Sequence, residues 1–372
     1  MAARTTPPFR ADHVGSLLRP QKLREARLKF EQKALPAAEL ARIEDDAIRD
    51  AVKLQEDLGF QAVSDGEYRR MSWNSDFLKG FSGVEVVEGQ IAVRFHSEAG
   101  AIETKPTGFR ITGTLSRPHG IFVEGYKFLR SVAHRETKVT IPSPTLLHFR
   151  GGRAAVDSVA YPDMEGFYAD LMRVYQEEIA DLAAAGCRYL QIDETNFAYL
   201  CDPVLRAQVR ENIGEDPARL PALYAKLLNG AIAKRPKDMA VCIHICRGNN
   251  QSAWVAEGGY EPVAEELFNA VDVDGYFLEY DSPRAGDFKP LRFVPKGKIV
   301  VLGLVTTKRP ELETKDELKR RIDEAARYMP LDQLALSPQC GFSSTVQGNK
   351  VTVDDEVKKL RLVVEVAREV WG

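Results

Sequence analysis

Side chains of the types that bind metal ions fall at the ends of predicted strands. His244 and Cys246 form an H-x-C motif in the apolar segment 239–246. Residues two apart on a strand point to the same face, and an imidazole nitrogen beside a thiolate sulfur suits zinc, which binds such ligands tetrahedrally. Alone, the motif is weak evidence, because a buried histidine beside a core cysteine is the commoner case, so a metal site needs further ligands.

Two further residues supply candidate ligands at equivalent positions. Cys340 ends a predicted strand in the sequence SPQCGF, and Glu279 lies in the apolar run FLEYD. A buried carboxylate is costly unless it is paired or bound to a metal. An arginine or lysine partner would explain Glu279, and a place in the core would explain Cys340. One zinc site formed with His244 and Cys246 explains all four residues together.

The predicted ligand set favours a particular chemistry. Zinc with two thiolate ligands is electron-rich, which favours a bound substrate thiolate over bound hydroxide. A thiol that coordinates zinc loses its proton, and the carboxylate of Glu279 is the ligand that an incoming thiol displaces most readily. The predicted reaction is therefore attack of a zinc-bound thiolate on an electrophilic carbon of an alkyl donor.

Other polar residues at predicted strand ends could bind an amino-acid substrate. Asp193 ends the run LQIDE, and Glu67 follows the run QAVSDG. Either carboxylate could bind an ammonium group. Gly15 would let the backbone approach a ligand, and the Ser16 hydroxyl could donate to a carboxylate. The alternatives are a helix N-cap for Asp193 and a surface ion pair for Glu67.

Apolar runs and helical patterns alternate along the chain, and these elements must position the candidate ligands. The predicted strands are 11–16, 61–66, 143–149, 188–194, 239–246, 275–281, 298–305 and 333–340. The predicted helices are 38–58, 164–185, 354–370 and one that starts with a capping box of Thr314 and Glu317. This alternation predicts an α/β fold with a parallel sheet. Eight strands indicate a (β/α)8 TIM-type barrel, which places its chemistry at the C-terminal strand ends.

One long segment, 76–141, interrupts this alternation with short β-like pieces. It is predicted to be an inserted β-rich excursion after the second strand. It would either cap the mouth of the barrel or form an ordinary surface insertion. The remainder of 1–372 is predicted to be a single barrel domain.

Composition excludes several classes of partner. The 372 residues include 51 basic and 54 acidic side chains, for a net charge of −3, which gives no reason to expect nucleic acid or an anionic membrane. The sequence shows no secretory signal and no membrane-spanning apolar run. Five cysteines, an odd and sparse set, indicate reduced thiols and a cytoplasmic location. The oligomeric state is left open.

The most specific motifs are SDGEYRR at 64–70, HICRGN at 244–249, FLEYD at 277–281 and LSPQCGF at 336–342. With them, nearly the whole chain resembles the catalytic half of cobalamin-independent methionine synthase, in its short single-barrel form. The resemblance implies Zn²⁺ as cofactor, homocysteine as the thiol and methionine as the product. The implied zinc ligands are His244, Cys246, Glu279 and Cys340. The implied homocysteine contacts are Gly15, Ser16, Glu67 and Asp193.

Two departures from the family pattern concern the methyl donor. The family's catalytic histidine lies in a D-I-H-S-P stretch, where this chain has Lys308 in TTKRP. Lysine is a cation at neutral pH unless strongly desolvated, so Lys308 could orient an anionic donor. The family's pterin-stacking tryptophan aligns with His148 or Phe149. Two alternatives therefore stay open: a related zinc alkyltransferase that acts on another thiol or an epoxide, and a non-catalytic zinc-stabilised binding barrel.

Overall fold

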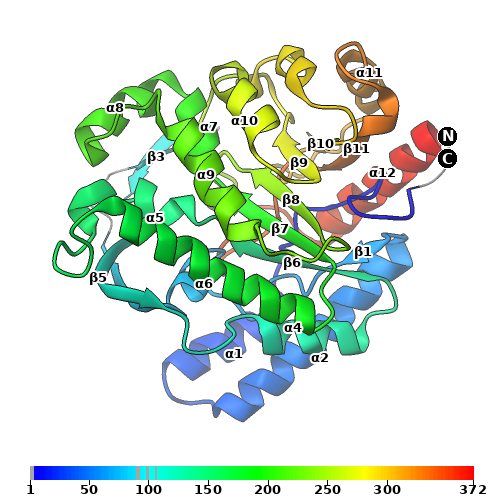
Figure 1. The fold of residues 1–372 in the computed structure, drawn as a ribbon. Coiled ribbons are helices and arrows are strands. Elements are labelled where there is room, and N and C mark those ends of the chain that lie inside the picture. The colour runs from blue at the N-terminus through cyan, green and yellow to red at the C-terminus, as the bar shows by residue number, and fades with distance from the viewer. Residues whose placement is uncertain (1–3, 89–92, 98–99, 105–106) are drawn as a thin grey trace.

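The computed structural model describes residues 4–88, 93–97, 100–104 and 107–372. Within these ranges, parallel strands form one curled sheet in the order β1-β6-β7-β8-β9-β10-β11 (Figure 1). The strands are β1 (Ala62–Val63), β6 (Glu136–Pro142), β7 (Tyr189–Glu194), β8 (Ala240–Ile245), β9 (Gly275–Glu279), β10 (Ile299–Val305) and β11 (Leu334–Pro338). Helices in the connections cover the outer face of the sheet, as expected of parallel strands joined by helical crossovers.

An N-terminal segment, residues 10–17, lies between the two edges of this sheet. The Asp12 backbone N–H donates to the Leu336 carbonyl in β11 at 3.0 Å, and the Leu17 N–H donates to the Gly66 carbonyl after β1 at 3.1 Å. The segment thus takes the place of an eighth strand. The fold is the predicted α/β barrel of TIM type, with this segment joining its two edges.

Residues 11–16 are not the regular strand that the sequence predicted. A single β-bridge pairs Ala11 with Leu336. The Asp12 carboxylate accepts hydrogen bonds from the backbone N–H groups of Phe9 at 3.2 Å and His13 at 2.8 Å. Those two N–H groups therefore do not pair with a neighbouring strand, because a side chain has replaced the ladder partner.

The predicted third strand, 143–149, is wrong. The strand at this place in the sheet is β6, which pairs in parallel with β1 and β7, and residues Thr145–Phe149 form helix α5. Pro142 and Pro144 lack the N–H group that a longer ladder needs, so the strand ends there. A short apolar run such as TLLHF does not distinguish a strand from a buried helical turn.

The remaining predicted strands agree with the structure to different degrees. The segments 188–194, 239–246, 275–281, 298–305 and 333–340 are confirmed as β7 to β11. The segment 61–66 contributes only the two residues of β1. It is cut short by a turn in which Gly66 and Glu67 have φ values of 65° and 60°, which a strand cannot contain.

The predicted amphipathic helices are also present. They are α2 (Ala37–Leu58), α6 (Met164–Ala184), α11 (Lys315–Ala325) and α12 (Val353–Trp371). The capping box is confirmed: the Thr314 hydroxyl accepts from the Glu317 N–H at 3.2 Å, and the Glu317 carboxylate accepts from the Thr314 N–H at 3.1 Å. Further α-helices are α1 (Gln21–Glu31), α7 (Asn196–Cys201), α8 (Pro203–Ile213), α9 (Leu220–Ile232) and α10 (Ala264–Ala270). In the part of the chain described, no helix is long and apolar enough to cross a membrane.

Between β1 and β6, the chain departs from the barrel pattern. It forms α3 (Ser75–Leu78), the antiparallel pair β2 (Ser82–Val87) and β5 (Gly108–Ser116), the hairpin β3 (Val93–Ser97) and β4 (Gly100–Thr104), and α4 (Val123–Val132). Because β6 begins at Glu136, the expected end of the excursion at 141 is too late. That the segment is an insertion relative to other barrels stays a prediction.

The N-terminal end of the barrel interior is filled by a buried polar network. Lys138 and Asp12 form an ion pair at 2.8 Å, with both side chains fully buried, and the Tyr189 hydroxyl donates to Asp12 at 2.8 Å. The Lys138 ammonium also lies 4.5 Å from the ring centroid of Phe277. These contacts pair a charge that would be costly to bury alone, and they occupy the end of the barrel opposite the C-terminal strand ends.

Candidate metal centre and substrate pocket

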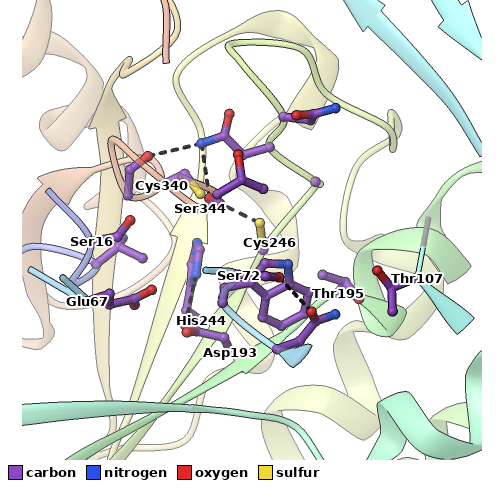
Figure 2. A pocket seen from close by; sticks show the side chains of 18 of the residues that line it. Ser16, Glu67, Ser72, Thr107, Asp193, Thr195, His244, Cys246, Cys340 and Ser344 are labelled. Carbon is purple, nitrogen blue, oxygen red and sulfur yellow. Dashed lines mark hydrogen bonds and ion pairs between the residues drawn. The ribbon is translucent and has the colours of Figure 1, made fainter. Parts of the chain in front are cut away.

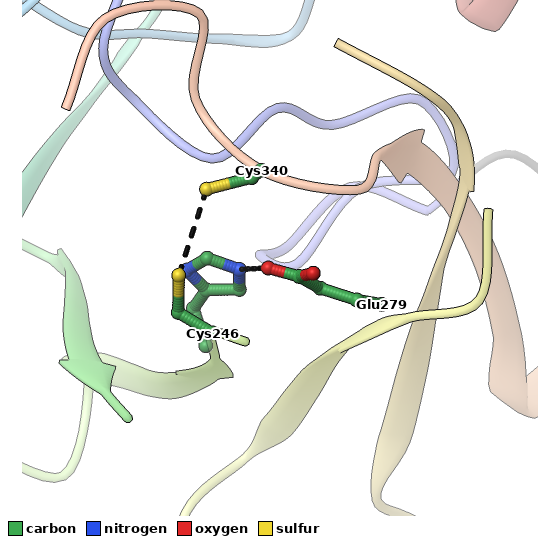
Figure 3. A group of neighbouring side chains, drawn as sticks. Cys246, Glu279 and Cys340 are labelled. Atoms are coloured by element: carbon green, nitrogen blue, oxygen red, sulfur yellow. Dashed lines mark hydrogen bonds and ion pairs between the residues drawn. The ribbon is translucent and has the colours of Figure 1, made fainter. Parts of the chain in front are cut away.

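The four predicted metal ligands come together at the C-terminal ends of three strands. His244 lies in β8 and Cys246 directly after it, Glu279 ends β9, and Cys340 follows β11. One ligand atom from each residue lies within 4.8 Å of all the others (Figure 3). Cys246 is partly open to solvent, and the other three side chains are buried. The barrel therefore joins residues up to 96 positions apart into one cluster.

The spacing of this cluster fits a tetrahedral zinc ion. The Cys246 and Cys340 sulfurs are 3.7 Å apart, and His244 Nε2 is 3.6 Å from Glu279 Oε1. In a tetrahedral zinc site, two sulfurs at about 2.3 Å from the metal are about 3.8 Å apart, and nitrogen and oxygen ligands are about 3.4 Å apart. The sulfurs are too far apart for a disulfide, whose bond is about 2.05 Å.

The His244 ring is held on both sides by carboxylates. Its Nδ1 faces Asp193 Oδ1 at 3.4 Å, and its Nε2 faces Glu279 Oε1 at 3.6 Å. Burial alone would lower the pKa of His244, but its hydrogen bonds with Asp193 and Glu279 outweigh this and raise the pKa to about 10. A carboxylate on the far nitrogen of a metal-binding histidine orients the ring and fixes its tautomer, which makes Nε2 the candidate ligand atom.

The pKa values of the two thiols, Cys246 and Cys340, depend on each other. Their mutual contact lowers the pKa of Cys340 and raises the pKa of Cys246. One of the two thiols therefore ionises before the other, and the second ionises only against the charge of the first. A divalent cation between the two sulfurs would remove this conflict, because a metal-bound thiol is deprotonated. The chemistry of the donor set thus fits zinc as well as its spacing does.

Cations lie on the outer side of Glu279 and beside the cluster. The Arg284 Nη2 atom is 3.8 Å from Glu279 Oε2, and Lys308 Nζ donates to Asn249 Oδ1 at 3.1 Å. Burial raises the pKa of Glu279, but His244, Lys308 and Arg284 together lower it below its ordinary value. Lys308 thus lies near the cluster, although it is not among the residues that line the adjoining pocket.

A pocket of about 350 Å³ opens onto this cluster (Figure 2). His244, Cys246 and Cys340 form part of its wall. Its other lining residues include Ser16, Glu67, Asp193, Trp73, Phe95, Thr107, Arg150, Thr195, Tyr199 and Ser344. Phe95 and Thr107 come from the segment between β1 and β6, so part of the excursion does reach the pocket. Backbone hydrogen bonds of 2.6 and 2.9 Å between His96 and Trp254 attach its hairpin beside the loop that follows β8.

Two buried carboxylates, Glu67 and Asp193, line this pocket, and each has one oxygen held by a neighbour. The Thr140 hydroxyl donates to Glu67 Oε1 at 2.8 Å, and the Gln191 amide donates to Asp193 Oδ1 at 2.7 Å. Burial raises the pKa of Glu67, the Arg70 guanidinium opposes this, and Asp193 adds to it. Two acids in one buried wall favour a cationic partner, since a nearby positive charge relieves both burial and mutual repulsion.

The simpler explanations for these two carboxylates are wrong. Asp193 lies within β7, and the N-cap of the following helix α7 is Thr195. Glu194 supplies the capping oxygen instead, because it accepts from the backbone N–H groups of Asn196 and Phe197. Glu67 is 3% exposed, so it is not part of a surface ion pair.

Ser16 lines the pocket, whereas Gly15 is not among its lining residues. At Gly15, with φ of 128°, a Cβ atom would lie 2.7 Å from Thr140 Cγ2 and 3.4 Å from Glu67 Oε1. Glycine is therefore needed here to let the N-terminal segment approach β6. Ser16 is packed just as closely against Gly341, the residue after Cys340, where a Cβ would lie 1.9 Å from the Ser16 hydroxyl.

Several residues of the site were not assigned a role from the sequence. Arg19 is buried and joins the loops around the pocket, and its guanidinium donates to Ser343 O, Ser343 Oγ, Thr345 O, Glu67 O and Arg70 O. Arg70 is the last residue of the SDGEYRR motif. Its place in that motif is the only feature of the sequence that could have pointed to a role for it. His148 and Phe149 do not line the pocket, but Trp73 and Tyr199 do.

Together, the fold and the site define a TIM-type barrel with a candidate zinc centre at the C-terminal ends of its strands. The family model described as the catalytic domain of cobalamin-independent synthase matches residues 9–369. The chain belongs to this family.

The chain is also similar to individual proteins over nearly its whole length. The chain is 46% identical over 371 residues to the Bacillus subtilis protein YxjG, named as uncharacterized, and the match covers 99% of this chain and 96% of YxjG. A solved structure from Listeria monocytogenes, described as a putative vitamin-B12 independent methionine synthase, is 36% identical, has a TM-score of 0.78 and covers 99% of this chain and 100% of its own. A Shewanella structure, described as a B12-independent methionine synthase in complex with selenomethionine, shares the fold at 21% identity and a TM-score of 0.71, with 97% of each chain covered.

Proposed function

We propose that this protein is a zinc-dependent methyltransferase that transfers a methyl group to the thiol of homocysteine and so forms methionine. The observation that carries the proposal is one pocket that joins two features. His244, Cys246, Glu279 and Cys340 cluster within 4.8 Å of one another, and the first two and Cys340 line the same pocket as the buried carboxylates of Glu67 and Asp193. A short amino-acid thiol would use both features at once.

The residues of the chain have separate parts in this proposal. Glu67 and Asp193 bind the ammonium group of the substrate, and the Ser16 hydroxyl donates to its carboxylate. Gly15 brings the backbone close enough to Thr140 for these groups to surround one small molecule. Asp193 also contacts His244 Nδ1 at 3.4 Å, so the group that binds the amine is joined directly to the candidate metal site.

The four clustered residues would hold zinc, and zinc would supply a deprotonated, nucleophilic substrate thiol at neutral pH. Asp193 orients the His244 ring, and the Arg247 backbone N–H holds Glu279 Oε1 at 3.2 Å. In the reaction, a sulfur–carbon bond forms as the bond from the methyl carbon to the donor breaks, and the donor leaves with the electron pair. Because the two thiols must stay reduced, we place this reaction in the cytoplasm.

The Shewanella protein in complex with selenomethionine supports a product of this shape, since selenomethionine is the selenium analogue of methionine.

The identity of the methyl donor is a separate question from that of the product. Other parts of the pocket wall come from Trp73, Phe95, Arg150 and Tyr199, and Lys308 lies beside the metal cluster. We propose that Lys308 orients an anionic group of the donor. A second candidate function, alkyl transfer to a thiol without an amino group, leaves Glu67 and Asp193 without a partner.

A product assay tests the proposal. Zinc-loaded protein and homocysteine would be given donors that carry an isotopically labelled methyl group: methyltetrahydrofolate with one or several glutamates, methylcobalamin and S-methylmethionine. We expect labelled methionine from at least one of them and none with the Cys246→Ser, Cys340→Ser double variant. Failure of every donor would contradict methyl transfer to homocysteine. Alkylation of a thiol without an amino group, tested in parallel, would then support the second function.

A further inference from the structure

Glu67 has an unusual backbone conformation for a side chain that points into a buried site. Its φ is 60°, and the preceding Gly66 has φ of 65°. A non-glycine residue is strained in this left-handed region, so the surroundings must hold it there. Arg19 holds the backbone, because its Nη2 donates to the carbonyls of Glu67 at 3.0 Å and Arg70 at 2.8 Å.

The Glu67 side chain is held by a second arginine, Arg70. The Arg70 guanidinium donates to Thr140 Oγ1 at 2.9 Å and to the Thr140 carbonyl at 2.8 Å. Arg70 Nη1 is also 3.6 Å from Glu67 Oε1, the oxygen that accepts from the Thr140 hydroxyl at 2.8 Å. The guanidinium rests 4.2 Å from the ring centroid of Phe122, and its side chain is 6% exposed. Arg70 and Thr140 thus fix one oxygen of Glu67 from behind.

The other oxygen of Glu67 has been left without a partner. Among the described residues, Oε2 is a buried atom with no hydrogen-bond donor. Leaving a buried charged acceptor unpaired costs several kcal/mol, and a bound ammonium group between Glu67 and Asp193 would supply the missing donor. Figure 2 shows the Glu67 side chain directed toward His244 and Asp193, the direction from which such a group would approach.

We propose that Arg70 is a positioning residue for amine recognition. With Thr140, it presents the Glu67 carboxylate to the amino group of the substrate and so makes the pocket select thiols that carry a primary amine. This inference rests on the proposed function, because it assumes a thiol in this pocket. Arg70 does not need to touch the substrate, since it acts through Thr140 and Glu67. Its positive charge also offsets the cost of keeping Glu67 ionised beside Asp193.

The chain offers a matched control in the neighbouring residue, Arg69. Its guanidinium pairs instead with two carboxylates of α2, Glu44 at 3.1 Å and Asp45. Arg69→Met therefore removes an arginine from the same loop without disturbing Glu67. Thr140→Val is the second test variant, because it removes the hydroxyl that donates to Glu67 and keeps the methyl group that packs beside Gly15.

The experiment compares two thiols: homocysteine and 4-mercaptobutanoate, which is homocysteine without its amino group. Their dissociation constants would be measured on cobalt-substituted protein from the thiolate-to-cobalt absorption band. Loss of a charged hydrogen bond costs about 1.5–3 kcal/mol, so Arg70→Met should weaken homocysteine about 10- to 150-fold and 4-mercaptobutanoate by less than about threefold. Thr140→Val should show the same selective loss, and Arg69→Met should bind both thiols as the parent does.

Three results would overturn the inference. They are an equal loss for both thiols in Arg70→Met, no selective loss in Thr140→Val, or a loss in Arg69→Met as large as in Arg70→Met. If Arg70→Met does not fold, as judged by circular dichroism, Thr140→Val decides the question. A different result, in which the parent protein binds neither thiol, would contradict the proposed function itself.

Discussion

The contact between Ser16 and Gly341 gives a prediction that can be worked out from the structure. Gly341 directly follows Cys340, a candidate metal ligand, and Ser16 is a candidate contact for the substrate carboxylate. In Gly341→Ala, the new Cβ would lie 1.9 Å from Ser16 Oγ and 3.1 Å from Ser16 Cβ. The first distance is about 1.5 Å short of ordinary van der Waals contact. The Ser16 hydroxyl must therefore leave its present position.

The expected size of this effect follows from the general cost of overpacking. Inserting a methyl group into a well-packed site costs about 1–3 kcal/mol. If the cost falls on the substrate site, homocysteine should bind about 5- to 150-fold more weakly. Metal content should stay the same, because Cys340 keeps its own backbone and side chain. The assays are homocysteine titration on cobalt-substituted protein and metal analysis after dialysis.

Two further variants separate a local clash from general damage. Gly113→Ala is the matched control, because a Cβ at Gly113 meets no atom within 4 Å, and it should bind homocysteine as the parent does. Ser16→Gly removes both atoms that the new methyl group would strike most closely. The double variant with Gly341→Ala should therefore recover stability, although not the hydroxyl contact. Unchanged homocysteine affinity in Gly341→Ala would refute both the close contact between Ser16 and Gly341 and the role of Ser16 in binding the substrate carboxylate.

Three other predictions concern Glu356, Arg19 and Lys308. Burial raises the pKa of Glu356 to about 8 from an ordinary 4.5, so the folded state keeps a proton that the unfolded state releases, and stability falls as pH rises through this window. Glu356→Gln should remove this slope and be more stable at pH 8.5 by up to about 5 kcal/mol, as urea titrations at pH 5.5, 7 and 8.5 would show; a slope as steep as in the parent would contradict it. Arg19→Met should destabilise the fold by about 3 kcal/mol or more, because it removes the donor that joins the loops around the pocket; a loss below about 1 kcal/mol in urea denaturation would contradict this. Lys308→Met should raise the KM of an anionic donor about 10-fold or more and leave the KM of homocysteine unchanged, with partial recovery in Lys308→Arg; equal changes in both constants would contradict a role toward the donor.

The candidate metal ligands could be predicted from the sequence because their positions follow simple rules. A strand sends alternate residues to one face, and a parallel barrel brings all its C-terminal strand ends to one rim. His244, Glu279 and Cys340 needed only their places at the ends of predicted strands, and Cys246 needed only its spacing from His244. The structure brings these four residues within 4.8 Å.

The groups that support these ligands could not be predicted in the same way. Arg19 reaches Ser343 across 324 positions, and Arg70 reaches Thr140 across 70. Such contacts depend on how long side chains cross between loops, which neither spacing nor periodicity encodes. The close packing of Gly15 against Thr140 is a further example, and a backbone contact from Gly15 to the substrate stays a prediction.

The mistakes in the fold have local causes. The Asp12 carboxylate accepts from the backbone N–H of His13, inside the predicted strand 11–16, and from that of Phe9 just before it. Pro142 and Pro144 end β6 before the apolar run that was expected to form it. In both places the alternation of strands and helices was predicted correctly. The regularity of the strand at 11–16 and the position of the strand at 143–149 were not.

The central claim is that these four residues hold a zinc ion that accepts the thiol of the substrate. Zinc X-ray absorption spectroscopy on dialysed, zinc-loaded protein tests it most directly. We predict one tightly held zinc with two sulfur ligands and two nitrogen or oxygen ligands, and three sulfur ligands after homocysteine is added. Loss of the zinc on dialysis, or a sulfur count that homocysteine does not change, would contradict the account.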